Sequence, residues 1–265
     1  MEKTKNFIDQ MQRKVVLKRF PPQRIVSLVP SQTELLAHFG LEKQVIGITK
    51  FCIYPNTWFR EKKRIGGTKD FKIAEIEALK PDIIIANKEE NEQQKIETLA
   101  KKHSVWISDI QNLEDAYAMI LMLGQLTDKE KEAVFLLKNI REKFEQLPKI
   151  KNSRVAYFIW RKPYMAAAKN TFIDEMLKYC GFTNVLSLEN ERYPVIELEN
   201  LKSLQLDFIF LSSEPYPFKE KHFAEIQAVL PTVKIMLVDG EMFSWYGSRL
   251  LKAADYFKKL INKLA

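Results

Sequence analysis

Short runs of β-branched and apolar residues alternate along the chain with amphipathic stretches. The first run, Ile25–Val29, ends at Pro30, and Ser31 to Glu34 match a helix-capping box, so a helix is expected from there to Gly40. Further strands are predicted at Val45–Thr49, Ile83–Ala86, Val105–Ser108, Val155–Trp160, Phe208–Leu211 and Ile235–Val238. This alternation is typical of βα units, which build mainly parallel sheets.

The α/β pattern stops once and then restarts. Residues 128–147 contain no Gly or Pro, and their apolar residues recur at spacings of 4, 3, 4 and 3, which predicts one long amphipathic helix. The helix–Asp–strand segment Glu75–Ile85 resembles Glu199–Phe210, as expected for a repeat. We therefore predict two similar α/β lobes with mainly parallel sheets, joined by one long rigid helix, with a ligand cleft between the lobes. The predicted division is an N-terminal extension (1–23), an N-terminal lobe (24–124), a connecting helix (125–150) and a C-terminal lobe (151–265).

Composition excludes several classes of protein. The 265 residues are 46% hydrophobic and 29% charged, a globular balance, and the basic residues behind the net charge of +8 are scattered, which argues against nucleic-acid binding. Two cysteines and three widely spaced histidines predict no disulfide framework and no metal site. No apolar stretch is long enough for membrane insertion. The polar first residues resemble no export signal, so the chain is expected in the cytoplasm if Met1 is the true start, and in the periplasm if an export signal is missing.

Candidate binding residues follow the predicted strands, because ligands of open α/β sheets lie at the carboxyl ends of the strands. Aromatic residues, arginines and carboxylates dominate these loops, which suits a flat, partly charged organic ligand. The candidates in the first half are Ser31, Lys50, Phe51, Tyr54, Thr68, Lys88 and Glu89. Those in the second half are Trp160, Arg161, Tyr164, Tyr193, Glu214, Tyr216, Glu241, Phe243, Trp245, Tyr246 and Arg249.

Several candidates have a structural alternative. Trp160 could equally be a core residue, whereas Trp245 and Tyr246 lie beside Gly247 in a turn-like segment that predicts exposure. Arg161 and Arg249 could pair with carboxylates or bind an anionic group of the ligand.

Two loops have competing interpretations as well. Cys52 near Lys50 could be a reactive thiolate, although a half-buried loop cysteine is the simpler interpretation. Glu89 and Glu90 could act as paired carboxylates, or they could belong to a polar helix start. Residues 66–69 lack the spacing of a phosphate-binding loop and predict a turn that carries Thr68 and Lys69 into the cleft.

Three segments, Arg24–Leu36, Val45–Thr49 and Ala78–Ala86, resemble the vitamin B12 and ferric-siderophore class of ABC-transporter substrate-binding proteins. The resemblance covers about residues 24 to 260. It implies a helical-backbone, two-lobed solute-binding protein, not an enzyme, which holds a corrinoid or metal chelate as ligand and requires no cofactor. Phe243–Arg249 occupies the place of a cleft loop in the B12-binding members.

The resemblance also implies a permease partner. Periplasmic members dock through one glutamate on each lobe. The matching position of the second lobe holds Glu199, while that of the first holds Ala74 with Glu75 next to it. The alternative function is a cytoplasmic enzyme or sensor that acts on a related small ligand through Glu89, Glu90, Glu214 or Glu241.

Overall fold

A computed structural model describes residues 3–151 and 153–264, which form two compact units. The first, here called the N-lobe, contains Met1–Ile110, Glu114–Asn139 and Tyr246–Arg249. The second, the C-lobe, contains Gln111–Leu113, Ile140–Trp245 and Leu250–Ala265. The boundary falls inside helix α6 (Glu130–Glu145), and a short late segment of the chain belongs to the N-lobe. No helix among the described residues is long and apolar enough to cross a membrane.

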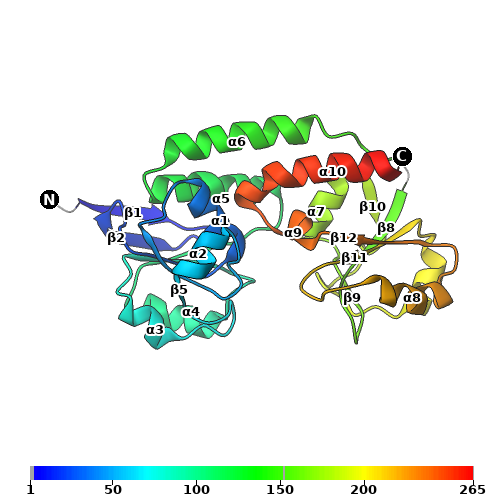
Figure 1. Cartoon of the computed structure of the whole chain (residues 1–265), viewed down its shortest axis with the longest axis horizontal. Helices are drawn as coiled ribbons and strands as arrows, with labels where there is room; N and C mark the ends of the chain where they lie inside the picture. Colours follow the sequence, from blue (N-terminus) through cyan, green and yellow to red (C-terminus); the bar gives the residue numbers. More distant parts are fainter. Residues whose placement is uncertain (1–2, 152, 265) are drawn as a thin grey trace. The chain divides into compact units, whose positions relative to one another are not determined.

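The N-lobe contains a five-stranded parallel sheet in the order β5-β4-β3-β6-β7. Its strands are β3 (Ile25–Ser27), β4 (Val45–Ile48), β5 (Lys63–Arg64), β6 (Ile83–Asn87) and β7 (Val105–Ser108). Every residue of β3 and β6 is buried, as expected for strands covered on both faces. Helices α1 (Pro30–His38) and α5 (Leu113–Leu126) lie on one face of this sheet, and α3 (Ile73–Ala78) and α4 (Gln93–Ala100) on the other (Figure 1).

The predicted capping box at the start of α1 is wrong. The N-cap residue is Val29, no side chain caps the helix, and Pro30 occupies its first turn. Proline is favoured there because it needs no hydrogen bond from its nitrogen. The helix therefore begins before Ser31, which lies inside it. The predicted stop at Gly40 is confirmed, since this glycine has a φ of +72° just after the helix.

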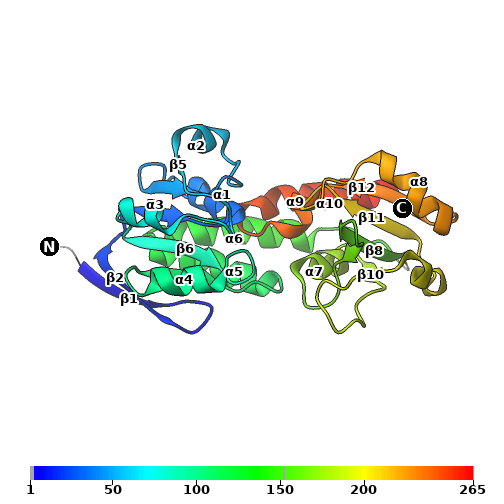
Figure 2. The same cartoon turned by 90° about the horizontal axis from the view of Figure 1, so that it is seen from below.

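Three elements of the N-lobe differ from the prediction. The loop expected at residues 50–69 contains a short helix, α2 (Asn56–Glu61), and strand β5. Helix α5 was missed. The N-terminal extension forms an antiparallel hairpin of β1 (Lys3–Ile8) and β2 (Lys14–Phe20), coloured dark blue in Figure 2.

The C-lobe sheet has the order β10-β8-β11-β12, with β9 paired antiparallel to β8. Its strands are β8 (Ser153–Trp160), β9 (Met165–Ala166), β10 (Phe182–Asn184), β11 (Phe208–Ser212) and β12 (Lys234–Val238). Its helices are α7 (Phe172–Tyr179), α8 (Phe223–Val229), α9 (Gly240–Ser244) and α10 (Leu250–Leu264), with short 3₁₀ helices η1 (Leu198–Leu204) and η2 (Glu220–His222). A third, η3 (Gly247–Arg249), belongs to the N-lobe. Both sheets thus contain four neighbouring parallel strands in the same arrangement. The two-lobed α/β fold is confirmed.

The two lobes also share the contacts that begin their sheets. Asp82 Oδ2 accepts hydrogen bonds from the backbone N–H groups of Gln23 (2.7 Å) and Arg24 (2.9 Å), and Asp207 Oδ2 accepts one from that of Arg154 (2.7 Å). Each aspartate directly precedes a buried central strand.

The arginines complete the match. The Nε of Arg24 donates to the carbonyl of Leu79, and that of Arg154 donates to the carbonyl of Leu204, both at 3.0 Å. The residue after each leucine, Lys80 or Gln205, has a left-handed φ of +46° or +47°. The internal repeat inferred from the sequence is therefore repeated in individual hydrogen bonds.

The helix predicted at 128–147 is α6, which is shorter than expected because Asp128 has a φ of +60° and ends the preceding helix region. Its predicted apolar face is confirmed. The buried residues of that face are Ala133, Leu137, Ile140, Phe144 and Leu147.

Candidate ligand-binding site

The carboxyl ends of the N-lobe strands rest on buried amides and hydroxyls. Asn87, the last residue of β6, donates from Nδ2 to Ser108 Oγ (3.0 Å), which also accepts from the Gln32 amide. Asn87 Oδ1 accepts from the N–H groups of Glu89 (2.8 Å) and Glu90 (3.0 Å). These two glutamates therefore lie in a turn held by Asn87. The interpretation as a helix start is wrong, because α4 begins at Gln93.

Lys88 and Thr68 flank this turn. Lys88 Nζ lies 2.6 Å from Asp109 Oδ2, so its charge is paired at the end of β7. The carbonyl of Thr68 accepts from Asn91 Nδ2 (2.9 Å). Residues 66–69 form the predicted turn, with Gly66 at a φ of +106°.

Cys52 lies in the core beneath the same edge. Its sulfur is 3.1 Å from the hydroxyls of both Thr33 and Thr49. Burial raises the pKa of the Cys52 thiol, and the two hydroxyls offset this only in part. A reactive thiolate is therefore not supported, and the side chain is fully buried rather than half-buried.

The loop after β4 presents exposed rings. The Phe51 side chain is 50% exposed and that of Tyr54 is 36% exposed, whereas most aromatic side chains of the chain are buried. Lys50 Nζ lies 5.1 Å from the Phe51 ring centroid. Gly67 packs beneath, where a Cβ would come within 3.3 Å of that ring and 3.4 Å of the lysine side chain. This loop thus combines apolar rings with a positive charge.

Arg249 is buried, and its guanidinium packs against the ring of Tyr54. Its Nε donates to Glu34 Oε2 at 2.8 Å, and its guanidinium lies 4.3 Å from the Tyr54 ring centroid. Of the two alternatives for Arg249, the structure contains the carboxylate pair, and Glu34 is a site residue that the sequence interpretation missed. The sequence pattern assigns Glu34 to the capping box instead.

The segment before Arg249 is buried, contrary to expectation. Tyr246 in the N-lobe and Trp245 in the C-lobe are both buried, so the predicted exposure of this pair is wrong. Gly247 allows the close packing, since a Cβ there would meet Leu35 at 3.3 Å and the carbonyl of Ser31 at 3.5 Å. Ser31 is itself buried.

The C-lobe presents Trp160 at the end of β8. Its side chain is 41% exposed, which excludes the core alternative, and its ring lies 5.8 Å from that of Tyr216 in an edge-on arrangement. Tyr216 in turn contacts Phe218 at a centroid distance of 4.8 Å. The exposed ring of Trp160 therefore packs against an aromatic cluster of Tyr216 and Phe218.

Arg161 is paired rather than open to a ligand anion. Its Nε lies 3.1 Å from Glu225 Oε2, and its Nη2 contacts the same oxygen. This pairing raises the pKa of Arg161 and lowers that of Glu225. Burial raises the pKa of neighbouring Tyr164 to about 12. Of the two alternatives for Arg161, a carboxylate partner or an anionic group of the ligand, the structure contains the carboxylate partner.

Phe243 does not form part of an exposed wall. It is fully buried, with ring centroids 4.8 Å from Phe257 and 5.0 Å from Tyr157. At the start of helix α9, which carries Phe243, Gly240 lies so close to Ser212 that a Cβ there would meet the Ser212 hydroxyl. Phe243 is therefore a core residue, and its predicted place in the ligand wall is wrong.

The carboxylates of Glu214 and Asp239 in the C-lobe accept hydrogen bonds from nearby groups. Glu214 Oε1 accepts from Ser244 Oγ (2.8 Å) and from Trp245 Nε1 (2.9 Å). The backbone N–H of Glu241 donates to Asp239 Oδ1 (3.1 Å). Tyr193 lies in the loop before η1, with its ring centroid 5.8 Å from the Arg192 guanidinium. None of the described residues forms a group of three or more His, Cys, Asp or Glu side chains suited to a metal.

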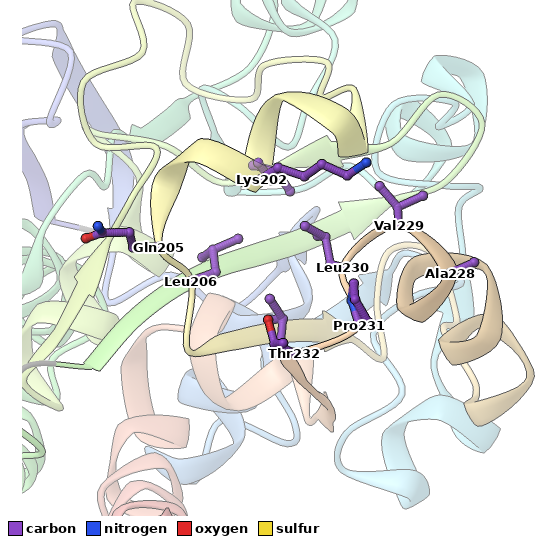
Figure 3. A pocket seen from close by; sticks show the side chains of 10 residues that line it. Lys202, Gln205, Leu206, Ala228, Val229, Leu230, Pro231 and Thr232 are labelled. Atoms are coloured by element: carbon purple, nitrogen blue, oxygen red, sulfur yellow. The ribbon is translucent and has the colours of Figure 1, made fainter.

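A pocket of about 480 Å³ lies elsewhere in the C-lobe, between η1 and the loop that joins α8 to β12 (Figure 3). Its walls include Lys202, Gln205 and Thr232 beside Leu206 and Pro231. The pocket lies where β11 and β12 begin, opposite the carboxyl ends, and none of the predicted ligand residues lines it. We therefore assign the candidate site to the carboxyl ends.

The family model of periplasmic binding proteins matches residues 25–234, and the chain belongs to this family. A vitamin B12-binding protein of Vibrio campbellii is 27% identical over 197 residues, 72% of this chain and 71% of the relative. A vitamin B12-binding protein of Pectobacterium carotovorum subsp. carotovorum is 24% identical over 252 residues, 92% and 90% of the two chains.

Solved structures agree with this assignment at the level of the fold. The periplasmic vitamin B12 binding protein BtuF of Vibrio cholerae superposes with a TM-score of 0.74 at 20% identity, covering 92% of this chain and 98% of BtuF. The periplasmic heme-binding protein BhuT in complex with two hemes gives a TM-score of 0.78 at 19% identity, with 91% and 99% covered. The predicted class, a solute-binding protein of this two-lobed type, is confirmed.

Proposed function

We propose that this chain binds a corrinoid or a metal chelate as a component of an ABC transporter, using the carboxyl ends of both sheets. One observation carries the proposal: each lobe presents exposed aromatic rings at that edge, Phe51 and Tyr54 in the N-lobe and Trp160 in the C-lobe. The relatives named for vitamin B12 and heme support the ligand class. Their periplasmic names lead us to propose a place outside the cytoplasm, and the expected cytoplasmic location gains no support.

The rings suit a flat macrocycle. One face of Tyr54 lies against the Arg249 guanidinium, which fixes the ring before a ligand arrives. Stacking on a large planar ligand would then bury apolar area without a large loss of side-chain freedom. Lys50 beside Phe51 supplies a positive charge for an acidic group at the rim of the ligand.

Tryptophan fluorescence tests the proposal, because Trp160 is exposed while Trp58, Trp106 and Trp245 are buried. Cobalamin, hemin and a ferric hydroxamate are titrated separately into the full chain. We expect one of them to quench fluorescence at micromolar concentration. Trp160→Phe should raise the ligand concentration needed for half-maximal quenching, whereas Trp58→Phe should leave it unchanged. The absence of quenching by all three probes would contradict the proposal.

A matched pair of variants locates the ligand independently of fluorescence. Tyr54→Ala should weaken binding by roughly tenfold or more, about 1.4 kcal/mol. Phe135→Ala removes an even more exposed ring (67%) from α6 and should leave affinity unchanged. Equal effects of the two variants would mean that the aromatic edge is not the site.

The proposed permease contacts are Glu75 and Glu199. Glu75 lies on α3, 3.1 Å from Lys72 Nζ and 3.2 Å from Lys63 Nζ, and these lysines lower its pKa. Glu199 on η1 is paired with Lys202. Both carboxylates are near the surface, and exchanging an exposed lysine for a permease arginine costs little.

The alternative of an enzyme acting through cleft carboxylates gains no support. Glu214 accepts hydrogen bonds from a serine and a tryptophan, and Glu89 lies in a turn fixed by Asn87. The family to which the chain belongs is a class of binding proteins.

A further inference from the structure

The outer edge of the N-lobe sheet is covered. Residues of a parallel strand alternate between bonding to the neighbouring strand and pointing away from it. The N–H of Ile84 donates to the carbonyl of Ser104, so the peptide groups of Val105 and Ile107 in β7 point away from β6.

The N-terminal hairpin satisfies these outward groups. Arg13 Nη2 donates to the carbonyl of Val105 (2.9 Å), and the N–H of Gln10 donates to the carbonyl of Ile107 (3.2 Å). The N–H of Ile107 donates to Asp9 Oδ2 (3.3 Å). The hairpin thus closes an edge that could otherwise pair with another strand.

Strand β12 occupies the same position in the C-lobe. Counting from the shared aspartate, Ile84 and Ile209 are equivalent, and their partners Val105 and Ile235 are equivalent too. Leu237 accordingly corresponds to Ile107 in β7.

The outward groups of β12 have no comparable cover. The N–H of Lys234 donates to the carbonyl of Asp207 and the carbonyl of Val238 accepts from Ser213, so Ile235 and Leu237 point away from β11. Within residues 3–151 and 153–264, no group hydrogen-bonds to their peptide units. Leu237 is also 41% exposed, and Ile235 and Met236 are half-buried.

An uncovered apolar edge strand is a template for another strand, and soluble proteins usually protect such edges. We propose that β12 pairs antiparallel with β12 of a second copy of this chain, which joins the two C-lobe sheets into one continuous sheet. A two-fold axis at Met236 sets Ile235 opposite Leu237 of the second copy. These residues are the ones whose N–H and C=O groups point outward, so both pairs exchange hydrogen bonds without any change of register.

The sequence of β12 is compatible with pairing to its own copy. Its centre, Ile235 to Leu237, is apolar, and its only charge is Lys234 at one end. Antiparallel pairing places the two lysines about four residues apart along the ribbon, about 14 Å at 3.4 Å per residue, beyond the Debye length of about 8 Å at physiological salt. An isologous contact of this kind closes at the dimer.

Sedimentation equilibrium of the full chain tests the proposal. We expect a reversible shift from 31.1 kDa to twice that mass as concentration rises. Leu237→Lys places a charge opposite the apolar Ile235 of the second copy and makes the two new lysines diagonal neighbours, so it should weaken dimerisation at least tenfold. Phe135→Lys, which replaces a more exposed apolar residue on α6, should not weaken it. A monomer at every concentration up to about 1 mM, or equal behaviour of both variants, would overturn the proposal.

Hydrogen exchange of the wild-type chain gives a second readout, which holds even if the Leu237 variant does not fold. The amides of Ile235 and Leu237 should exchange more slowly as concentration rises, while that of Met236, bonded within the sheet, stays slow throughout. Dimer mass without this protection would refute the pairing. If the protection persists on dilution, and the sample is a monomer with a co-purified peptide bound, the edge of β12 has a different occupant. Ligand binding is not needed for either measurement, so failure here leaves the proposed solute binding intact.

Discussion

The N-lobe and the C-lobe begin their sheets with the same hydrogen bonds and end them differently. Arg24 and Asp82 in one lobe repeat the contacts of Arg154 and Asp207 in the other. At the carboxyl ends, Asn87 organises amides and hydroxyls in the N-lobe, while the C-lobe packs aromatic rings around Phe243. The shared contacts maintain a fold, whereas the divergent ends are free to shape a ligand site. The comparison thus separates residues needed for folding from residues available for binding.

The largest expected effect tests whether Phe243 belongs to the first group. Phe243→Ala should lower the free energy of unfolding by about 3–5 kcal/mol, because it opens a cavity among Tyr157, Phe210 and Phe257. Phe51→Ala at the half-exposed N-lobe edge should change it by about 0.5 kcal/mol or less. Urea unfolding measures both. A stable Phe243→Ala protein with weakened ligand binding would restore the original wall prediction.

The shared strand starts should matter in both lobes. Asp82→Ala removes a carboxylate that accepts from two backbone N–H groups, and Asp207→Ala removes one that accepts from a single N–H. We expect losses of about 1.5–3 kcal/mol, larger for Asp82. Asp70→Ala is the control, since this side chain is exposed and paired with Lys95. Unfolding curves in urea should rank the three variants in that order, and a silent Asp207→Ala would mean that the repeat is not energetically equivalent.

Much of this comparison follows from the sequence because it depends on local patterns. The buried strands, the glycine stop after α1 and the Asp-strand repeat each follow from a few neighbouring residues. Strand β7 has the predicted bounds, Val105–Ser108. The capping box failed although it was also local, because Pro30 competes for the first turn and starts the helix earlier.

The errors at the site have a different cause. Whether Trp160, Trp245 or Phe243 faces solvent depends on segments distant in sequence, such as α10 behind Phe243 and Glu214 beside Trp245. No periodicity within a loop contains that information. The partners Glu34 and Glu225 were missed for the same reason, since each pairs with an arginine far along the chain. The cleft between the lobes stays a prediction.

The two free cysteines allow a finer comparison through pH. Burial alone raises the pKa of Cys180 to about 12, from an ordinary value of 9.0. The folded state therefore favours the protonated thiol, and its stabilisation is complete below pH 9 and is lost as pH rises from 9 towards 12. The loss should approach about 1.4 kcal/mol per pH unit between pH 10 and 11.

Lysines and tyrosines also titrate in this range, so the measurement is a difference between variants. The pH slope of the unfolding free energy should be shallower in Cys180→Ala than in wild type. Burial also raises the pKa of the Cys52 thiol, which the hydroxyls of Thr33 and Thr49 oppose in part. Cys52→Ala should therefore make the slope shallower as well, and identical slopes in all three proteins would exclude the effect.

The smallest effect on stability is expected at the proposed docking residues, where the lobes differ by one position in a helix. Glu75→Gln and Glu199→Gln each break exposed lysine pairs, which contribute little to folding, so neither should shift the urea midpoint measurably. Their effect should appear only in binding to a permease in detergent or nanodiscs. The matched control is Glu77→Gln. Glu77 lies on the same helix as Glu75, and the substitution breaks its pair with Lys102. If Glu77→Gln weakens permease binding as much as Glu75→Gln, the contact depends on the charge of the whole helix, and the one-residue displacement between the lobes has no bearing on docking.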